Sequence, residues 1–358
     1  MNITQKLSVA ALVGLAPTAW AQSTVTLSGI VDAAVRNVTN EGVGSLTTVL
    51  SGSNSTSRLV FTAREDLGKG LAAGMHLEHG FLIDSGSPAS NEKFFDRRST
   101  LSLFSKEWGE VRLGRDFVPS YTAWSRHDPF AYVGAARSAN FVSATPVGPI
   151  RSAFGTSANT TVRSDNGVQW ITPRIAGGFD ATLMWAPREG GTAANGLAEV
   201  SGVRVGYTAK QWHVTAASTR SRNNLTVDGS FSDNVMGGGF TAAGAQVTVA
   251  WREFKYSQTS QSMVMVAAQR NFGPHELKGS WIKTNLKGSV GITSVDANDA
   301  TQIGLGYVYN LSKRTALYAT AAQISNDSQA RFAISDGRAG LVAAGTSRGY
   351  EAGVRHRF

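Results

Sequence analysis

Apolar and polar residues alternate repeatedly along this chain, and this alternation restricts the folds that it can adopt. In the run that begins at Ser23, the apolar residues Val25, Leu27 and Val31 alternate with polar residues that include Asp32. A β-strand points successive side chains to opposite faces, so a period of two predicts strands with one apolar and one polar face. Sixteen such runs are expected, over residues 23–36, 57–66, 71–82, 94–104, 110–116, 162–172, 178–186, 200–209, 211–221, 235–243, 245–257, 262–272, 275–286, 301–311, 314–324 and 347–358.

The connections between these runs alternate between short and long. Turns such as SKEWG (105–109) and FGPH (272–275) alternate with Gly/Ser/Asn/Asp-rich loops such as 222–234 and 325–346. Beyond the N-terminus, no apolar run approaches the ~20 residues that a transmembrane helix needs. A sheet survives in lipid only when it closes on itself with apolar residues outside, and this pattern is typical of such barrels. We therefore expect residues 22–358 to form an all-β, 16-stranded antiparallel transmembrane β-barrel.

The first residues, 1–21, are expected to be a signal peptide and not a buried helix. Lys6 supplies a positive start, residues 7–15 are apolar, and Ala-Trp-Ala at 19–21 forms a small-x-small cleavage site before Gln22. The chain contains no cysteine, which excludes a disulfide framework and thiol chemistry. Both features suit a protein that is exported through the oxidising periplasm.

Composition and motif spacing argue against several other functions. The formal net charge is +9, but only 16% of the residues are charged and the basic ones are scattered singly, unlike those of nucleic-acid-binding domains. His76 and His79 are three apart, which on a strand points them to opposite faces, and no histidine has a metal-ligand spacing. No motif marks a catalytic set. We expect no enzyme activity, no cofactor, no metal and no nucleic-acid partner.

The longest connection, residues 117–161, is expected to be an ordered loop. It lacks a regular apolar period but carries aromatic residues that include Tyr121, Trp124, Phe130 and Phe141. Disordered linkers contain few aromatics, and loops of this length are usually functional or disordered. Arginines outnumber acids within it. We therefore expect this loop to fold into the lumen of the barrel, to narrow it, and to bring positive charge with it.

The last strand runs to a free terminal phenylalanine. Tyr350, Val354 and Phe358 lie on one face of this run, and Glu351 and Arg355 lie on the other. This ending resembles the signal that the barrel-assembly machinery recognises in outer-membrane proteins, so that machinery is an expected partner. The alternative is the edge strand of a soluble sandwich, but an exposed edge with a terminal aromatic would invite aggregation.

Six sequence strings, in the same order along the chain, resemble the general diffusion porins of Gram-negative bacteria, especially their β-proteobacterial branch. The strings are VTLSGIVDAAVR, SRLVFTAREDLGKGL, FFDRRSTLSL, VRLGRDFVPSYTAW with DPF after it, RSDNGVQWITP and AGVRHRF. The resemblance implies a sixteen-stranded homotrimeric porin in the outer membrane, in contact with lipid and lipopolysaccharide. It also implies that the third external loop folds inward and forms the eyelet of the pore.

The same resemblance implies a basic cluster at this constriction. The first member falls on Arg58, which its own alternation also points inward. For the second, the family motif indicates Arg97, whereas alternation places Arg98 on the polar face; we favour Arg97 and keep Arg98 as the reserve. For the third, Arg151 is closer to the family spacing, while Arg163 belongs to the RSDNGVQW string. Arginine stays charged at any relevant pH, so such a cluster would attract anions and repel cations.

One acid, Asp128, is expected at the loop tip opposite these arginines. Porins of this family often place several acids there, so a single acid in a longer loop predicts a narrower, more positive constriction. The expected function is passive diffusion of small hydrophilic solutes with a preference for small anions. The alternative is a substrate-specific channel for phosphate, organic anions or sugars, in which the loop aromatics form a stacking track. A barrel used for adhesion or enzymology, with a plugged lumen, is the third possibility.

Overall fold

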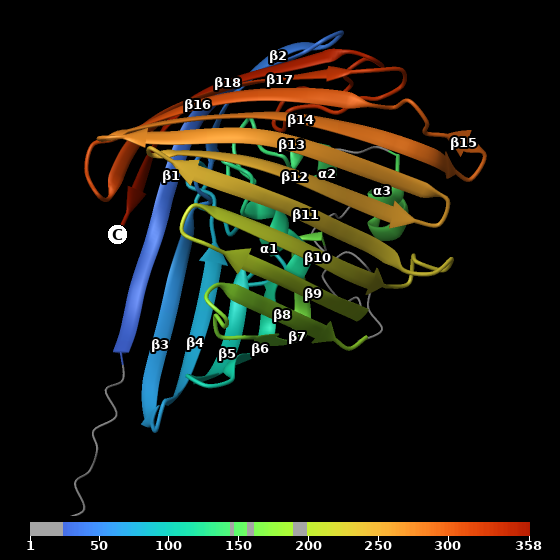
Figure 1. Cartoon of the computed structure of the whole chain (residues 1–358). Helices are drawn as coiled ribbons and strands as arrows, with labels where there is room; N and C mark the ends of the chain where they lie inside the picture. Colours follow the sequence, from blue (N-terminus) through green and yellow to red (C-terminus); the bar gives the residue numbers. More distant parts are fainter. Residues whose placement is uncertain (1–23, 144–146, 156–160, 189–198) are drawn as a thin grey trace, which may run out of the picture.

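The computed structural model describes residues 24–143, 147–155, 161–188 and 199–358, and the expected signal peptide lies outside this part. One sheet closes on itself because β1 (Thr24–Asn40) pairs antiparallel with β18 (Thr346–Arg357). The other neighbouring strands are also antiparallel. Figure 1 shows the curved wall that results, with short helices inside it.

Eighteen strands occupy sixteen positions around this wall. Strands β2 (Gly44–Ser51) and β3 (Arg58–Gly68) both pair with β1, β2 along its second half and β3 along its first half, so they form one interrupted barrel strand. Strand β15 (Thr293–Ser294) pairs only with the end of β14 and extends a hairpin. The expected 16-stranded antiparallel barrel is therefore confirmed.

The remaining wall strands follow one another in sequence order. They are β4 (Leu71–Gly80), β5 (Arg98–Ser105), β6 (Gly109–Phe117), β7 (Arg163–Ile171), β8 (Phe179–Ala186), β9 (Glu199–Thr208), β10 (Trp212–Arg222), β11 (Phe231–Ala242), β12 (Ala245–Tyr256), β13 (Thr259–Phe272), β14 (His275–Val290), β16 (Ala300–Asn310) and β17 (Thr315–Asn326). Connections such as 69–70, 243–244 and 273–274 are tight turns at one end of the barrel. In outer-membrane barrels, that end faces the periplasm.

The clearest difference from the predicted strands lies in residues 37–53, which were expected to be a loop. β1 instead continues to Asn40, and a hairpin leads directly into β2. Gly42 and Gly44 adopt φ values of 87° and 84° that favour glycine, which closes the turn tightly. The apolar residues of β2, Leu46, Val49 and Leu50, do not follow a period of two, so the hairpin carries no alternating apolar signal for a sequence reading to detect.

The two faces of the wall differ as the alternation predicts. On β1, Val25 and Leu27 are 73% and 59% exposed on the outer face, whereas Asp32 and Arg36 are buried inside. Lipid would cover the outer face, because apolar side chains exposed in a closed barrel are stabilised only there. The polar inner face can line an aqueous channel.

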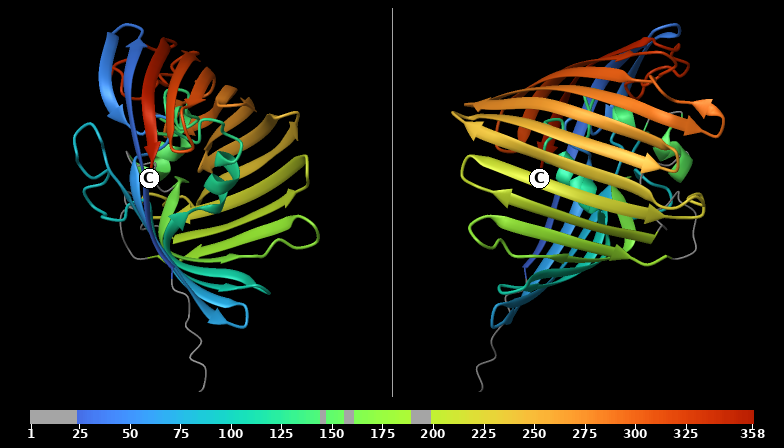
Figure 2. Two further views of the ribbon diagram at one scale, coloured as in Figure 1. Left: turned by 90° about the vertical axis from the view of Figure 1, so that its left-hand side faces the viewer. Right: turned by 45° about the vertical axis from the view of Figure 1, so that its right-hand side comes forward.

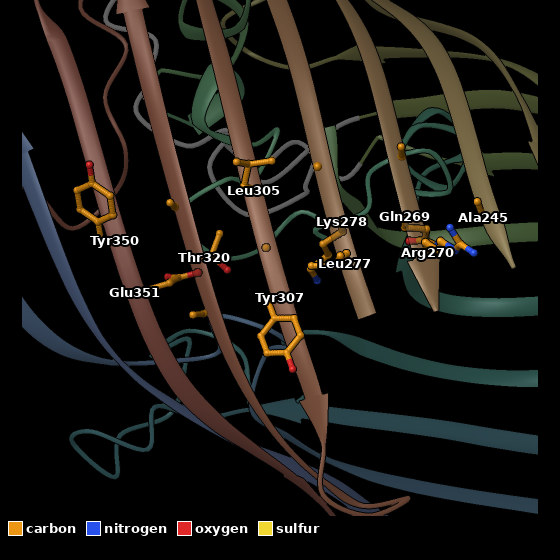
Figure 3. A pocket seen from close by; sticks show the side chains of 15 residues that line it. Ala245, Gln269, Arg270, Leu277, Lys278, Leu305, Tyr307, Thr320, Tyr350 and Glu351 are labelled. Atoms are coloured by element: carbon orange, nitrogen blue, oxygen red, sulfur yellow. The ribbon is translucent and has the colours of Figure 1, made fainter. Parts of the chain in front are cut away.

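Two hollows on the outer wall are also apolar. One groove of about 690 Å³ is bordered by Leu277, Leu305, Tyr307 and Tyr350. Figure 3 shows Leu305, Tyr307 and Tyr350 on the side of the strands turned away from the inner loop. A second groove of about 640 Å³ lies over β8 to β13. Both face the lipid, so neither is a route for hydrophilic solutes.

The described residues between Val118 and Val162 lie inside the barrel (Figures 1 and 2). They contain three short helices, α1 (Pro119–Ser125), α2 (Asn140–Ser143) and α3 (Pro149–Phe154). Helix α1 contacts β8 to β11, and α3 contacts β11 to β13. No helix in the described ranges has the length and apolar character needed to cross a membrane.

A hydrophobic cluster joins this inner loop to the wall. Trp124 and Phe141 of the loop are fully buried, together with Phe254 and Ile282 of the wall. Each large apolar side chain contributes about 1.5–3 kcal/mol when it is removed from water. On β16, Gly304 leaves space for the loop, since a Cβ atom there would overlap Ala136. The inner loop is therefore a packed part of the fold.

Candidate functional site in the barrel lumen

A buried ion pair fixes the inner loop to one side of the wall. Arg252 on β12 and Asp233 on β11 are 0% and 2% exposed, and their Nη2 and Oδ2 atoms are 2.7 Å apart. The Ser120 hydroxyl of α1 donates a hydrogen bond to Asp233 at 2.6 Å. Arg252 in turn donates to the Tyr132 hydroxyl at 3.5 Å. The pair thus holds two separate points of the loop.

The tip of the loop is anchored elsewhere, on β16 and β18. Gln302 donates from Nε2 to the main-chain oxygen of Ala136 at 2.8 Å and accepts from Asn140 Nδ2 at 2.8 Å. The main-chain nitrogen of Ala135 donates to Glu351 at 3.1 Å. With α1 on β8 to β11 and the tip on β16 to β18, the loop extends across the lumen. None of the hydrogen bonds or ring contacts described for the loop reaches β3, β4 or β5.

Two of the expected arginines converge on one glutamate of this part of the wall. The Nε atoms of Arg58 and Arg97 lie 3.2 and 2.6 Å from Oε1 of Glu78, which is on β4. Glu78 pairs in register with Val60, and Val60 is two residues from Arg58, so Arg58 and Glu78 share the lumenal face. The structure thus brings Arg58 and Arg97 together at one point inside the barrel.

Arg98 also lies on the lumenal face, beside a second set of charges. It pairs in register with Glu78, and its Nε atom is 3.3 Å from Asp116, which also binds Arg112 at 2.6 Å. The strand expected over 94–104 begins only at Arg98, so that prediction was wrong for residues 94–97. Arg97 precedes the strand, where alternation does not apply. Both arginines therefore reach the lumen. The family motif, which indicates Arg97, and the alternation, which indicates Arg98, are compatible.

Of the two candidates for the third arginine, Arg163 lies beside Arg97. Its Nε atom donates to the main-chain oxygen of Arg97 at 2.7 Å, and its guanidinium lies over the Phe117 ring at 4.4 Å. Phe117 stacks on Tyr121 of α1 with ring centroids 4.7 Å apart. Arg151 is exposed on α3, and none of the contacts described for it reaches this cluster.

The wall cluster carries positive charge, whereas the loop opposite presents neutral groups. Arg58, Arg97 and Arg163 with Glu78 amount to three positive charges and one negative, a net charge of +2. Burial raises the pKa of Tyr121, and it raises that of Tyr132 to about 12, so both hydroxyls stay neutral at pH 7. An anion would meet donors on both sides, and a cation would meet repulsion from one.

Asp128 does not face the arginines, contrary to the sequence expectation. It is 5% exposed, and its carboxylate accepts hydrogen bonds from the hydroxyl and main-chain nitrogen of Ser138 at 2.6 and 3.2 Å. It also accepts from the main-chain nitrogens of Phe130 at 2.9 Å and Tyr132 at 3.2 Å. Burial raises its pKa. Asp128 folds the loop tip instead of setting a field across the lumen.

Sequence reasoning missed Glu78 and the Asp233–Arg252 pair. Glu78 lies on the polar face of the expected strand 71–82, which was an available signal. Nothing in the sequence spacing relates Asp233 and Arg252 to the loop, because they meet Ser120 and Tyr132 only after the barrel has closed.

The described part of the lumen contains no metal centre. Across the described ranges, no group of three or more His, Asp or Glu side chains could hold a metal ion. His76 contacts Glu78 at 3.3 Å, but the other partners of that glutamate are arginines.

Comparison with known proteins agrees with this architecture. Residues 8–329 match the model of the Gram-negative porin family. Outer membrane porin protein 32 of Delftia acidovorans is 34% identical over 375 aligned residues, which cover 99% of this chain and 100% of that protein. An outer membrane porin protein of Bordetella pertussis is 27% identical, with 98% of this chain and 99% of that protein covered. The solved anion-selective porin from Comamonas acidovorans superposes with a TM-score of 0.78 at 29% identity, covering 94% of this chain and 100% of that one. This chain belongs to the Gram-negative porin family, and it is an outer-membrane channel protein, not an enzyme.

Proposed function

We propose that this porin passes small hydrophilic solutes by passive diffusion and favours anions at a constriction formed by Arg58, Arg97 and Arg163. The observation that carries the proposal is that Arg58 and Arg97 meet on Glu78 and that Arg163 binds the main chain of Arg97, which gives the group a net charge of +2. The related porin from Comamonas acidovorans is described as anion-selective, which supports the same preference here.

The cluster is suited to weak and rapid exchange of anions. Glu78 orients Arg58 and Arg97 and neutralises one of the positive charges, so an arriving anion meets attraction without a deep binding well. Conduction requires binding that is favourable enough for entry and weak enough for release. Arginine cannot lose its proton in the physiological range, so this attraction would persist at any relevant pH.

Three copies are proposed to assemble in the membrane. Loop 81–97 stands out from the barrel in the left view of Figure 2, and Phe94 on it is 70% exposed. Lys93 holds the loop to the wall through Asp165 at 2.8 Å, which presents Phe94 in a defined position. A large exposed aromatic on an ordered loop supports an interface with another copy.

We further propose that lipopolysaccharide surrounds the external half of the barrel and that the barrel-assembly machinery recognises Phe358.

The experiment that tests this function is a zero-current potential measurement in a planar bilayer under a KCl gradient. The wild-type protein should give a potential of the sign expected for chloride permeation, and Arg58→Ala should reduce it. Arg314→Ala is the matched control, because it removes one exposed arginine from a periplasmic turn. A potential of the opposite sign, or equal effects of both substitutions, would contradict the proposal.

A substrate-specific channel remains the second candidate, because aromatic rings follow one another along the lumen. Phe117 stacks on Tyr121, and Tyr121 meets Tyr132 edge-on with centroids 5.2 Å apart. Such a track would slow one class of solute and saturate with its concentration. Conductance that rises linearly with salt, and swelling of liposomes at rates set by solute size alone, would favour passive diffusion.

A further inference from the structure

A second group of basic side chains lies near the periplasmic end of the lumen. Arg126, just after α1, donates from Nη2 to the hydroxyl of Thr208 at 3.0 Å, and Thr208 is the last residue of β9. Arg204 on β9 pairs with Asp180 on β8. Arg126 also lies within electrostatic range of Arg204 and Arg174. Three arginines and one aspartate leave a net charge of +2.

Two stacked histidines adjoin this group. His127 of the loop and His213 of β10 have ring centroids 5.3 Å apart and planes 18° apart. They are 2% and 6% exposed. Within the described part of the chain, neither ring nitrogen of His127 has a hydrogen-bond partner, and Nε2 of His213 also lacks one. Native proteins rarely leave buried polar atoms unpaired, so unpaired nitrogens on two adjacent rings indicate a functional role or a bound water molecule.

The wall is shaped to hold the pair and leaves room for water beside it. Gly237 on β11 faces the rings, and a Cβ atom there would lie 2.6 Å from Nε2 of His127. Thr248 on β12 donates to the main-chain oxygen of His127 at 2.9 Å. A cavity of about 40 Å³, bordered by Arg126 and His127, is large enough for a water molecule. A water molecule in this cavity would give His127 a hydrogen-bond partner and a source of protons while the loop stays docked.

Positive groups dominate the surroundings of His127. Its own loop contributes Arg126 and Asp128, but the Asp128 carboxylate is occupied by the loop hydrogen bonds described above. Strand β9 contributes Arg204, and β10 contributes His213. Burial, followed by His213, Arg126 and Arg204, lowers the pKa of His127 to about 4. The ring is neutral at pH 7 and gains a charge only in acid.

We propose that Arg126, Arg174 and Arg204, together with the His127–His213 pair, form a second anion-attracting site at the periplasmic exit of the lumen, whose positive charge rises in acid. Its ligands are small inorganic anions and carboxylates in transit. The inference rests on the proposed anion passage and adds a site separate from the constriction cluster. In 0.1 M salt, each added charge changes the local anion concentration by about twofold, so protonation of both rings would raise it about fourfold.

A fixed charge at one mouth of a channel makes the current depend on the sign of the voltage. The test compares single-trimer currents at equal positive and negative voltages in KCl, at pH 7 and at about pH 4. Acid should increase the asymmetry of the wild-type current. Arg126→Gln should reduce the asymmetry at pH 7. Replacement of both histidines, His127→Phe with His213→Phe, keeps the stacked rings and should remove most of the acid-dependent part, leaving only what the lumenal carboxylates contribute.

The Arg58→Ala variant separates anion preference at the constriction from the second site at the periplasmic exit. It should change the zero-current potential and leave the acid-dependent asymmetry in place. An acid response as large as that of the wild type in the double phenylalanine variant would overturn the inference. Stepwise closure of the wild-type channel in acid, without increased asymmetry, would also overturn it, because it would mean that protonation displaces the loop. If the double variant does not fold, His213→Phe alone, on the wall, should halve the response.

Discussion

Replacement of Asp233 by asparagine is expected to loosen the inner loop and leave the barrel wall intact. The substitution keeps the shape of the side chain and an acceptor for Ser120, but it removes the charge that compensates Arg252, which is 0% exposed. Breaking a buried ion pair by removal of one partner costs about 3–5 kcal/mol. The main-chain hydrogen bonds of β11 and β12 are unchanged, so the wall keeps its structure. The unpaired charge of Arg252 stays buried only while the loop is docked, so the cost destabilises the docked loop relative to the detached loop.

A cost of this size should be visible in single-channel recordings. At about 1.4 kcal/mol per tenfold, 3–5 kcal/mol raises the ratio of detached to docked loop by about two to three and a half orders of magnitude. Asp233→Asn should therefore show larger open-channel current noise and faster proteolysis within the loop. The matched control is the double variant Asp233→Leu with Arg252→Met, which removes both charges and should return the current toward wild-type noise.

Wild-type current noise and wild-type proteolysis in a correctly folded Asp233→Asn barrel would show that the Asp233 charge does not hold the loop. Heat-modifiable migration on a gel establishes that the barrel has folded. Noise that is equal in the single and double variants would lead to the same conclusion, since shape and not charge would then hold the loop.

Three further substitutions test the lumen. Asp128→Asn should raise channel noise but leave the ratio of anion to cation permeability near the wild-type value, and a loss as large as that of Arg58→Ala would show that Asp128 acts across the pore after all. Gly304→Val should push the loop tip away, because its Cβ would overlap Ala136; the single-channel conductance should change, and wild-type conductance would contradict the docking. Glu78→Gln should raise the cluster charge from +2 to +3 and increase anion preference by about fourfold in bi-ionic potentials, whereas a shift toward cations would contradict it.

The barrel could be predicted from sequence because lipid imposes a simple rule on every strand. The run expected over 245–257 is β12 at Ala245–Tyr256, and the run over 314–324 is β17 at Thr315–Asn326. Outer side chains must be apolar and inner ones can be polar, so apolar residues recur with a period of two in the sequence of most wall strands. In β2 the apolar residues Leu46, Val49 and Leu50 do not alternate with polar ones, so that signal is absent and the strand was missed.

The site could be predicted only in part, because its geometry depends on contacts between distant segments. Arg58 was placed inward by its own alternation, and the structure agrees on its face of β3. Glu78 was missed, although it orients two of the arginines. The position of Asp128 depends on hydrogen bonds within the folded loop tip, which no strand period encodes. Residues that act through a folded loop are therefore the hardest to predict from alternation.

In the proposed function, Arg58, Arg97 and Arg163 together make the channel favour anions. One guanidinium about 6 Å from a passing ion contributes about 0.7 kcal/mol in water, and about 0.4 kcal/mol remains after screening in 0.1 M salt. This attracts anions about twofold and repels cations about twofold, so each arginine should change the permeability ratio about fourfold.

The most direct test is the chloride-to-potassium permeability ratio, measured from zero-current potentials as the three arginines are replaced by alanine one, two and three at a time. We expect the ratio to fall about fourfold for each arginine removed. A ratio that stays at the wild-type value in the triple variant, with the barrel folded and conducting, would contradict it.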